Sequence, residues 1–389
     1  MKKIIASLLI CFSAVAIKAQ PFTSAPFVLQ GEHMTIQLNV NGKDSLLFIF
    51  DTGASTTVID SAAAVAIALK EVSKTTIAGA GGNASHAICS VDSITFKNFR
   101  LLNITAVKAS LASLSRSMGT TIHGIIGADI LRRYITAIDY DASTIRLYKD
   151  KNTIDFSIPA TSIPLDFSLG LSIPSVPLTI LLKDGTNITG DFLLDNGAGI
   201  TACINTPHVN DLQLLQKAGK VVKSTNKGLN SKSGNYLAAA QSISFAGYSF
   251  SDIPFILEQS AQGVVSMRIV KGLLGNVILK RFNILLDYAA KKMYIQPNNL
   301  FNSDFKFPMT GFKLEQVNKE LVVADINEES EAAKNGLQNG YILLSIDDQQ
   351  NLSLKEAREL LSKPGIRRLI FLDEKKQSRT ITLKLERLI

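Results

Sequence analysis

The chain has 389 residues, of which 46% are hydrophobic and 19% charged, and its formal net charge is +8 at pH 7. This length favours two or three domains. The basic residues are scattered, with no stripe of Arg and Lys, so the composition argues against nucleic-acid binding. The four histidines occur singly, without the spacing of a metal site, and we expect neither a metal nor another cofactor.

Residues 1–19 have the pattern of a secretory signal peptide. Lys2 and Lys3 give a positive start, an apolar stretch follows, and Ala19 ends it. Cys11 suggests lipid attachment as an alternative, but the residues before it lack the small side chain that such a site needs. No later stretch reaches the ~20 apolar residues of a membrane helix. We therefore expect an exported protein without a membrane span, in the periplasm, in the cell envelope or outside the cell.

Cys89 and Cys203 are the two cysteines that follow the signal peptide. Two cysteines do not make a disulfide framework, although an exported protein could pair them. The internal repeat described below places them at non-equivalent positions in separate halves. We expect free, buried thiols, with pairing as the alternative.

Residues 20–300 are predicted to be mostly β. Short runs of alternating apolar and polar residues, such as Met34–Val40, lie between turns rich in Gly, Asn and Asp. Segments of this kind are typical of strands in sheets with one buried face.

The same stretch contains an internal repeat. Asp51 and Asp195 each follow three apolar residues and precede a small polar residue, a Gly and an Ala. The block Gly124–Tyr134 recurs as Gly272–Phe282, a shift of 148 residues. Further blocks recur in the same order with nearly the same offset, which is the signature of a repeated structural unit. Two unrelated β-domains of similar composition are the alternative.

The residue types of each repeat have a physical explanation. A Gly after the Asp lets the chain make a tight turn, because Gly adopts positive φ values freely. The runs Ile125–Gly127 and Leu273–Gly275 are predicted to be buried strands that pass close under the Asp turns, where Gly admits another backbone. Residues 128–133 then favour a short helix with one apolar side.

The segment Phe50–Ala54, together with Ile125–Gly127, resembles the retropepsin-type and pepsin-type aspartic peptidases. The resemblance covers about residues 25–298. It implies a mostly β, two-lobed acid-protease β-barrel fold with pseudo-twofold symmetry, with lobes at residues 20–153 and 154–298. Because one chain carries both lobes, we expect a monomer that builds its cleft within the chain.

The resemblance also implies the roles of the site residues. Asp51 and Asp195 would share one proton and activate a water that attacks a peptide bond, because two close carboxyls cannot both ionise at once. The residues expected to support them are Thr52, Gly53, Ser55, Asn196 and Gly197. Thr52 would join interlocked hydrogen bonds between the two loops, and Ser55 would bond the outer oxygen of Asp51.

The second half departs from the family's pattern. Asn196 stands where Thr or Ser is usual, and Gly199 stands opposite Ser55. Asn can donate and accept hydrogen bonds, but with longer and less symmetric geometry. This departure puts the activity in question without affecting the fold.

A glycine-tipped hairpin over the cleft is expected from the same resemblance. Residues 77–83 are the candidate in the first half, with Gly79, Gly81 and Gly82 at the tip. The counterpart, near residues 227–234, is longer and more polar. Ordinary surface loops are the alternative.

The last part of the chain is richer in charge and in helical patterning. Strands are predicted at 321–326, 341–347, 368–372 and 380–385, with an amphipathic helix at Leu354–Leu361. This order resembles a small α+β PDZ domain over residues 309–389. The resemblance implies that a peptide adds to a sheet edge, with Gly311 and Phe312 in the loop that holds its C-terminal carboxylate. A purely structural cap is the alternative.

The sequence therefore predicts an exported aspartic endopeptidase that acts on a peptide or protein substrate. Its PDZ-like module would recruit substrate, binding a C-terminal peptide, or regulate the cleft. The alternative is a catalytically inactive peptide-binding protein on the same scaffold, which Asn196 and Gly199 favour.

Overall fold

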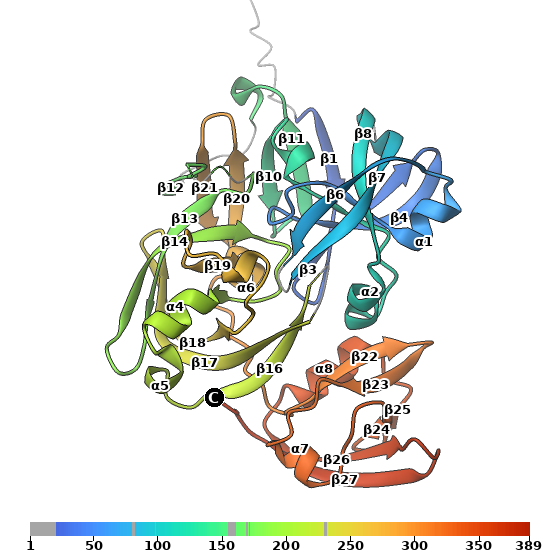
Figure 1. Ribbon diagram of the computed structural model, residues 1–389, viewed down its shortest axis with the longest axis vertical. Coiled ribbons are helices and arrows are strands. Elements are labelled where there is room, and N and C mark those ends of the chain that lie inside the picture. Colours follow the sequence, from blue (N-terminus) through green and yellow to red (C-terminus); the bar gives the residue numbers. More distant parts are fainter. Residues whose placement is uncertain are drawn as a thin grey trace, which may run out of the picture.

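The computed structural model describes residues 21–79, 82–97, 99–154, 161–168, 170, 172–228 and 232–389. The predicted signal peptide lies outside these residues. The described chain is mostly β and forms four sheets. Two sheets make the lobes, one joins them, and the fourth forms a separate C-terminal domain (Figure 1). The predicted fold class of two β-rich lobes with pseudo-twofold symmetry is confirmed for the described residues.

The N-terminal lobe is built on an eight-stranded sheet that curls so that β3 also pairs with β7. Its alternating sequence puts apolar side chains on the inner face, where Met34, Ile36 and Leu38 of β3 are buried. In spatial order its strands are β2 (Val28–Gln30), β3 (His33–Val40), β4 (Lys43–Phe50), β9 (Gly124–Ile126), β5 (Val58–Asp60), β8 (Phe99–Ala109), β7 (Gly82–Phe96) and β6 (Lys70–Gly79).

The C-terminal lobe repeats this topology. Its central strands β14 and β19 pair in parallel, as β4 and β9 do in the first lobe. The sheet also curls, because β13 pairs with β17. In spatial order its strands are β13 (Ser175–Leu181), β14 (Asn187–Asp195), β19 (Gly272–Gly275), β15 (Ala202–Ile204), β18 (Tyr248–Glu258), β17 (Lys232–Phe245) and β16 (Val222–Lys227).

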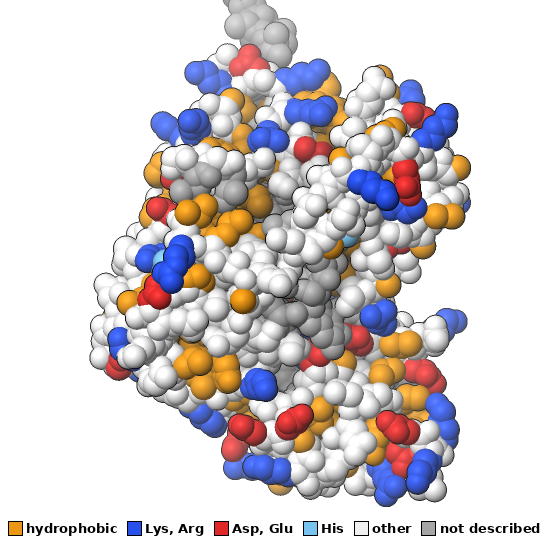
Figure 2. Space-filling view, in the orientation of Figure 1, with side chains coloured by type: hydrophobic (Ala, Val, Ile, Leu, Met, Phe, Trp, Pro, Cys, Tyr) orange, Lys and Arg blue, Asp and Glu red, His pale blue; other side chains and the backbone are white. Residues whose placement is uncertain are grey.

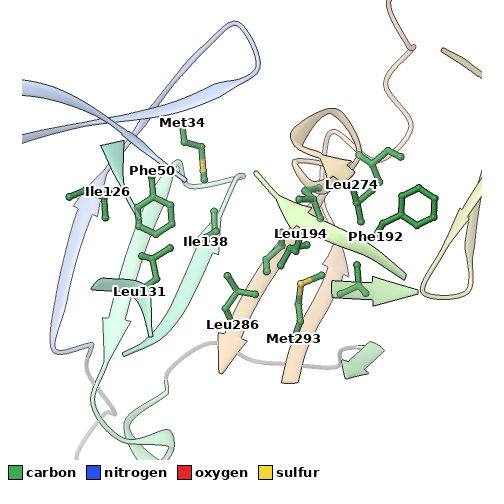
Figure 3. Packing of buried hydrophobic residues seen from close by; sticks show 14 of the residues in the cluster. Met34, Phe50, Ile126, Leu131, Ile138, Phe192, Leu194, Leu274, Leu286 and Met293 are labelled. Atoms are coloured by element: carbon green, nitrogen blue, oxygen red, sulfur yellow. The ribbon is translucent and has the colours of Figure 1, made fainter. Parts of the chain in front are cut away.

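The third sheet joins the lobes at the pseudo-twofold axis. The strand that ends each repeat meets its counterpart there, with Ile138 opposite Ile284. Ile138 of β10 and Leu286 of β20 lie between the side chains around Phe50 and those around Phe192 (Figure 3), so one apolar core runs through both lobes. The strands are β1 (Thr23–Pro26), β11 (Thr144–Tyr148), β10 (Ile135–Asp139), β20 (Phe282–Asp287), β21 (Lys292–Pro297) and β12 (Thr161–Pro164).

The C-terminal domain has its own sheet and its own apolar core. The strand β22 lies at one edge, paired with β23 alone. The helix α8 (Leu354–Leu361) spans the residues predicted from its amphipathic pattern and begins with a capping box formed by Ser353 and Glu356. The strands are β22 (Lys313–Val317), β23 (Glu320–Ala324), β24 (Ile342–Ile346), β26 (Gly365–Leu372) and β27 (Ser378–Leu385), with β25 (Gln349–Gln350) beside β24.

The remaining helices of the described chain are short. None is long and apolar enough to cross a membrane. The helices α3 and α6 follow the apolar-Gly blocks of the two repeats, where a short helix was predicted. The helices are α1 (Ser61–Ala66), α2 (Ala112–Met118), α3 (Ala128–Leu131), η1 (Lys151–Thr153), α4 (Thr206–Asp211), α5 (Leu214–Lys217), η2 (Val264–Ser266), α6 (Asn276–Leu279) and α7 (Glu331–Lys334).

Both cysteines in the described chain, Cys89 and Cys203, are buried and free. Burial raises the pKa of both thiols, so both are kept in the unreactive protonated form.

Candidate active site

The two Asp loops begin where a buried strand leaves the centre of each lobe. Phe50 of β4 lies beside Ile126 of β9, and the Asp51 amide donates to the Ile126 carbonyl at 3.0 Å. In the second lobe Asp195 itself pairs with Gly275 of β19. The hydrophobic strands thus carry each Asp to the lobe boundary, because their apolar side chains are held in the core.

The glycine that ends each apolar block allows the block to pass directly under the Asp loop. A Cβ at Gly127 would lie 2.8 Å from the carbonyl oxygen of Ala54, and one at Gly275 would lie 2.2 Å from that of Ile200. The next residue then bonds the loop, since the Ala128 amide donates to Ala54 and the Asn276 amide donates to Ala198, both at 2.8 Å. Only Gly permits these close contacts.

The two carboxyl groups face each other across the lobe boundary and are hydrogen-bonded to each other. Each also lies against the glycine of the opposite loop. A Cβ at Gly53 would fall 2.2 Å from Cγ of Asp195, and a Cβ at Gly197 would fall 2.1 Å from Cγ of Asp51. The loops are therefore interleaved, and the glycines make room for the opposing acids.

Desolvation dominates the electrostatics of the pair. Burial raises the pKa of Asp51, opposed by hydrogen bonds from the amides of Gly53 and Ala54, which lie 2.7 and 3.2 Å from Oδ1. Burial raises the pKa of Asp195 well above its ordinary value, and the charge of Asp51 raises it further. The Ala198 amide donates to Asp195 at 2.8 Å. Asp51 accepts hydrogen bonds from two amides and Asp195 from one, so hydrogen bonding stabilises the charged form of Asp51 more than that of Asp195.

Thr52 holds the two loops together through its side chain. Its hydroxyl donates to the carbonyl of Leu194 at 3.2 Å and accepts the amide hydrogen of Asn196 at 3.0 Å. Thr52 is buried, so both bonds are shielded from solvent. This side chain thus uses both its donor and an acceptor in the opposite lobe.

Asn196 makes only half of the equivalent set. Its Oδ1 accepts the amide hydrogen of Thr52 at 2.7 Å, which matches the bond from Asn196 to Thr52. Its Nδ2 is buried and has no hydrogen-bond partner among the described residues. Asn196 therefore accepts the amide hydrogen bond from the opposite loop, as Thr52 does, but it lacks the side-chain donor bond that Thr52 makes.

Ser55 and its counterpart Gly199 differ from the expectation that a side chain bonds the outer oxygen of each Asp. Ser55 is exposed, and no hydrogen bond joins it to Asp51 in the described chain. Residues of the first lobe lie where a side chain at position 199 would extend. A Cβ on Gly199 would lie 3.2 Å from Nε2 of His33 and 3.2 Å from Cβ of Glu32.

His33 is a site residue that the sequence analysis missed. Its Nδ1 lies 2.8 Å from the carbonyl oxygen of Gly197, so this nitrogen carries the donated hydrogen. Burial lowers the pKa of His33. The adjacent backbone is held as well, since Asn276 Nδ2 donates to the Glu32 carbonyl at 2.6 Å. The first lobe thus supports the second Asp loop where that loop lacks a side chain of its own.

A cavity of about 410 Å³ lies between the lobes, next to the Asp51 loop. Both lobes contribute apolar side chains, and several threonines and serines add hydroxyl groups. Its lining residues are Ser55, Thr56, Thr75, Thr76, Ile77, Ile88, Thr105, Ala106, Val107, Ser172, Ile173, Val264 and Met267.

The predicted glycine-tipped hairpin lies along this cavity. The strands β6 and β7 pair up to Gly79 opposite Gly82, and Ile77 lines the cavity wall. Gly81, which was predicted to be part of the tip, lies outside the described residues. The counterpart in the second lobe is the hairpin of β16 and β17, whose last described pair is Lys227 with Lys232. Its tip, residues 229–231, also lies outside the described residues.

The loop predicted to hold a peptide carboxylate has a different set of contacts. The Phe312 amide donates to Thr310 Oγ1 at 3.3 Å, and the Phe312 side chain is buried in the domain core. Gly311 adopts φ 74°, and a Cβ there would lie 2.2 Å from Cβ of Ser330. The amide of Phe312 is therefore already engaged within its own loop.

In the described residues no group of three or more His, Cys, Asp and Glu side chains is placed to hold a metal ion.

Comparison with known proteins identifies an aspartic-protease-like segment. Residues 36–130 match the family model described as aspartyl protease, a range that contains Asp51 and the apolar-Gly block of the first lobe. No curated protein matches the sequence. Among solved structures, the aspartic proteinase from Irpex lacteus aligns with 12% identity and a TM-score of 0.46, over 72% of this chain and 98% of that chain. The matched segment supports a protease-like function for this chain.

Proposed function

We propose that the protein is an exported aspartic endopeptidase whose catalytic pair is Asp51 and Asp195. The observation that carries this proposal is the mutual contact of the two loops, in which each carboxyl lies within 2.2 Å of the Cβ position of the opposite glycine. Such interleaving brings two acids together in a desolvated place, where one shared proton is favoured over two charges. A structural ion pair would need a basic partner, and neither acid has a Lys, Arg or His beside it among the described residues.

In the mechanism, Asp51 acts as the general base. It takes a proton from a water held between the carboxyls, and the water attacks the carbonyl carbon of the peptide bond. Asp195 is protonated, because it accepts fewer amide hydrogen bonds than Asp51 and the charge of Asp51 disfavours its ionised form, and it polarises the carbonyl oxygen. The tetrahedral intermediate then collapses as a proton reaches the leaving amine, so no covalent enzyme intermediate forms.

The substrate is an extended peptide that lies between the lobes. Apolar walls from Ile77 and Val107 on one side and Ile173 and Met267 on the other favour an apolar side chain in the cavity. Gly79 and Gly82, the last described pair of the β6–β7 hairpin, carry the end of a flap that closes over the peptide and excludes water. Since one chain supplies both acids, a monomer suffices.

A second candidate is a catalytically inactive peptide-binding protein on the same scaffold. The unpartnered Nδ2 of Asn196 favours it, because a loop held by fewer bonds positions Asp195 less firmly. In this case the cleft and the PDZ-like groove would bind peptides without hydrolysis.

The deciding experiment measures cleavage of a diverse peptide mixture from pH 3 to pH 8 by mass spectrometry. Asp51→Asn and Asp195→Asn are compared with the wild type and with Asp184→Asn. Asp184 is exposed, and its side chain accepts hydrogen bonds from Thr186, two residues along the chain. We expect cleavage by the wild type and the Asp184 variant, and none by either site variant.

Cleavage that persists unchanged in both site variants rejects the catalytic pair. A wild type that binds peptides and cleaves none at any pH supports the second candidate. Export is tested separately, by N-terminal sequencing of the protein recovered from the host's envelope and medium, and a chain that starts at Gln20 is expected.

A further inference from the structure

The edge strand of the C-terminal domain has backbone groups that face away from its sheet. The Val323 amide donates to Tyr341, and the Val323 carbonyl accepts from Gly340, so both groups point away from β22. Leu314 is the residue opposite Val323, and in an antiparallel pair its amide and carbonyl then point outward too. Helix α8 packs beside this strand, and the space between β22 and α8 is called the groove below.

The end of helix α2 of the N-terminal lobe lies in this groove. Gly119 ends the helix with φ 69°, and a Cβ there would lie 3.0 Å from Oε1 of Gln316 and 3.0 Å from Cδ2 of Leu354. Gln316 belongs to β22 and Leu354 to α8, so Gly119 lies between the two walls. Figure 1 shows α2 directly beside β22 and α8.

Polar contacts tie the same three elements together. Arg358 of α8 uses Nη2 to donate to the Ser117 carbonyl at 2.8 Å and to the outward Leu314 carbonyl at 2.7 Å. A second contact joins Arg116 Nε to Glu315 Oε2 at 3.6 Å. One guanidinium therefore links the strand edge to helix α2, at the acceptor that an added strand would use.

The other side of α2 packs against the core of the N-terminal lobe. Leu114 and Met118 contact an apolar cluster that contains Ile49 of β4 and Ile125 of the paired strand β9. Ile77 of the β6–β7 hairpin packs against the same cluster. Helix α2 is thus in contact with the C-terminal domain on one side, and on the other with a cluster whose members Ile77 and Val107 also line the interlobe cavity.

We propose that the groove between β22 and α8 is the docking site for the end of α2 in the same chain, residues 116–119. Docking occupies the Leu314 edge, so it excludes a peptide that would add to β22. It also restrains the β6–β7 hairpin through α2. A ligand strand and α2 compete for one surface, which makes the domain a regulator of the cleft rather than a free recruiting module. The docking itself does not depend on whether the protein cleaves peptides.

The test is hydrogen exchange measured by mass spectrometry on the full chain. Arg358→Met removes both bonds to carbonyls, and Gly119→Ala adds a methyl group against Gln316 and Leu354. Lys355→Met, an exposed position on the same helix, is the matched control. Losing the charge-assisted bonds should raise exchange about tenfold or more in residues 111–122, 313–317 and 70–79. Exchange in β10 and β20 should not change.

A rescue separates docking from general unfolding. Cysteines at positions 116 and 315, joined by a short bismaleimide in the Arg358→Met background, should restore protection in all three segments. The single-cysteine variants control for other thiols. If Arg358→Met and Gly119→Ala leave exchange unchanged in α2, or expose β22 while the β6–β7 hairpin keeps its protection, the proposed docking and restraint are wrong.

Discussion

Thr52 in the first lobe and Asn196 in the second occupy equivalent places at the lobe boundary, yet they are held by different contacts. Thr52 uses its hydroxyl as donor and acceptor, whereas Asn196 uses Oδ1 and leaves Nδ2 without a partner in the described chain. The second loop receives compensating support from His33, which bonds Gly197 from the other lobe. The comparison teaches that a repeated loop can keep its geometry while the groups that hold it change.

A second difference between the halves concerns the hydrogen bonds of two equivalent buried tyrosines, Tyr140 and Tyr288. The hydroxyl of Tyr140 donates to Asn276 Oδ1 at 2.7 Å. Tyr288 is the equivalent residue of the second repeat, and the residue equivalent to Asn276 is Ala128, which has no side-chain acceptor. The Tyr288 hydroxyl is buried without a partner in the described part of the chain. The polar contacts around the second Asp are thus drawn from both lobes.

The glycines of the two loops should be equally intolerant of a side chain. We expect Gly53→Ala and Gly197→Ala each to lower peptide cleavage about 100-fold or more, because the methyl group would occupy the place of the opposite carboxyl. Steady-state kinetics measures the effect, and circular dichroism checks that both variants fold. Full activity in Gly197→Ala alone would show that the second loop contributes nothing to the reaction.

The desolvated acids should make stability depend on pH. Because burial raises the pKa of Asp195 in the folded state, the native protein binds more protons than the unfolded chain above about pH 4. The contribution of Asp195 to the free energy of unfolding should therefore be highest below this pH and fall as the pH rises through the folded pKa, by at most about 1.4 kcal/mol per pH unit for one proton.

Urea unfolding from pH 4 to pH 8 measures this dependence. Asp195→Asn should flatten it, since Asn does not titrate, while Asp184→Asn should not. His33, whose pKa is lowered by burial, adds a slope of the opposite sign to both proteins, so the difference between the wild type and Asp195→Asn is the quantity compared. A wild type that gains stability relative to Asp195→Asn as the pH rises would contradict the assignment of a raised pKa.

Asn196→Thr should give the second loop the same pair of side-chain hydrogen bonds that Thr52 makes in the first. A Thr hydroxyl can accept from the Thr52 amide and also donate to a backbone carbonyl, and the unpartnered Nδ2 is removed. We expect the free energy of unfolding to rise by about 1 kcal/mol and kcat to rise. Thr52→Asn is the reciprocal control and should lower both. Loss of stability in Asn196→Thr would mean that the longer Asn side chain is needed for the loop spacing.

The smallest expected effect concerns the two tyrosines. Tyr140→Phe removes a buried hydrogen bond and should lower the free energy of unfolding by about 1 kcal/mol, whereas Tyr288→Phe removes a hydroxyl without a partner and should change it little. Thermal unfolding of both variants measures the difference. Equal losses would show that Tyr288 has a hydrogen-bond partner after all.

Much of this arrangement could be predicted from the sequence because it is periodic or repeated. The 148-residue shift between Gly124 and Gly272 predicted two similar lobes, and the pattern of Leu354–Leu361 predicted helix α8 with its observed bounds. Such patterns depend on residues that are close in the sequence or repeated at a fixed spacing, so they can be recognised without knowledge of the fold.

The contacts of His33 and α2 could not be predicted in the same way. His33 bonds a residue 164 positions away, and a single His at the start of a strand carries no motif. Helix α2 is short, and its partners lie about two hundred residues further along the chain. For Asn196, the sequence showed that the side chain can both donate and accept, but only the packed lobe boundary determines which of these it does.

The two lobes belong to one polypeptide chain, and the antiparallel pairing of β10 with β20 also joins them in a common sheet. In a symmetric dimer of single lobes, one gene encodes both loops, and every substitution appears twice. Here the two copies are inherited together but mutate independently. A change such as the one at Asn196 can therefore persist in one half while the other keeps its Thr, and a partner such as His33 can be recruited for one side alone.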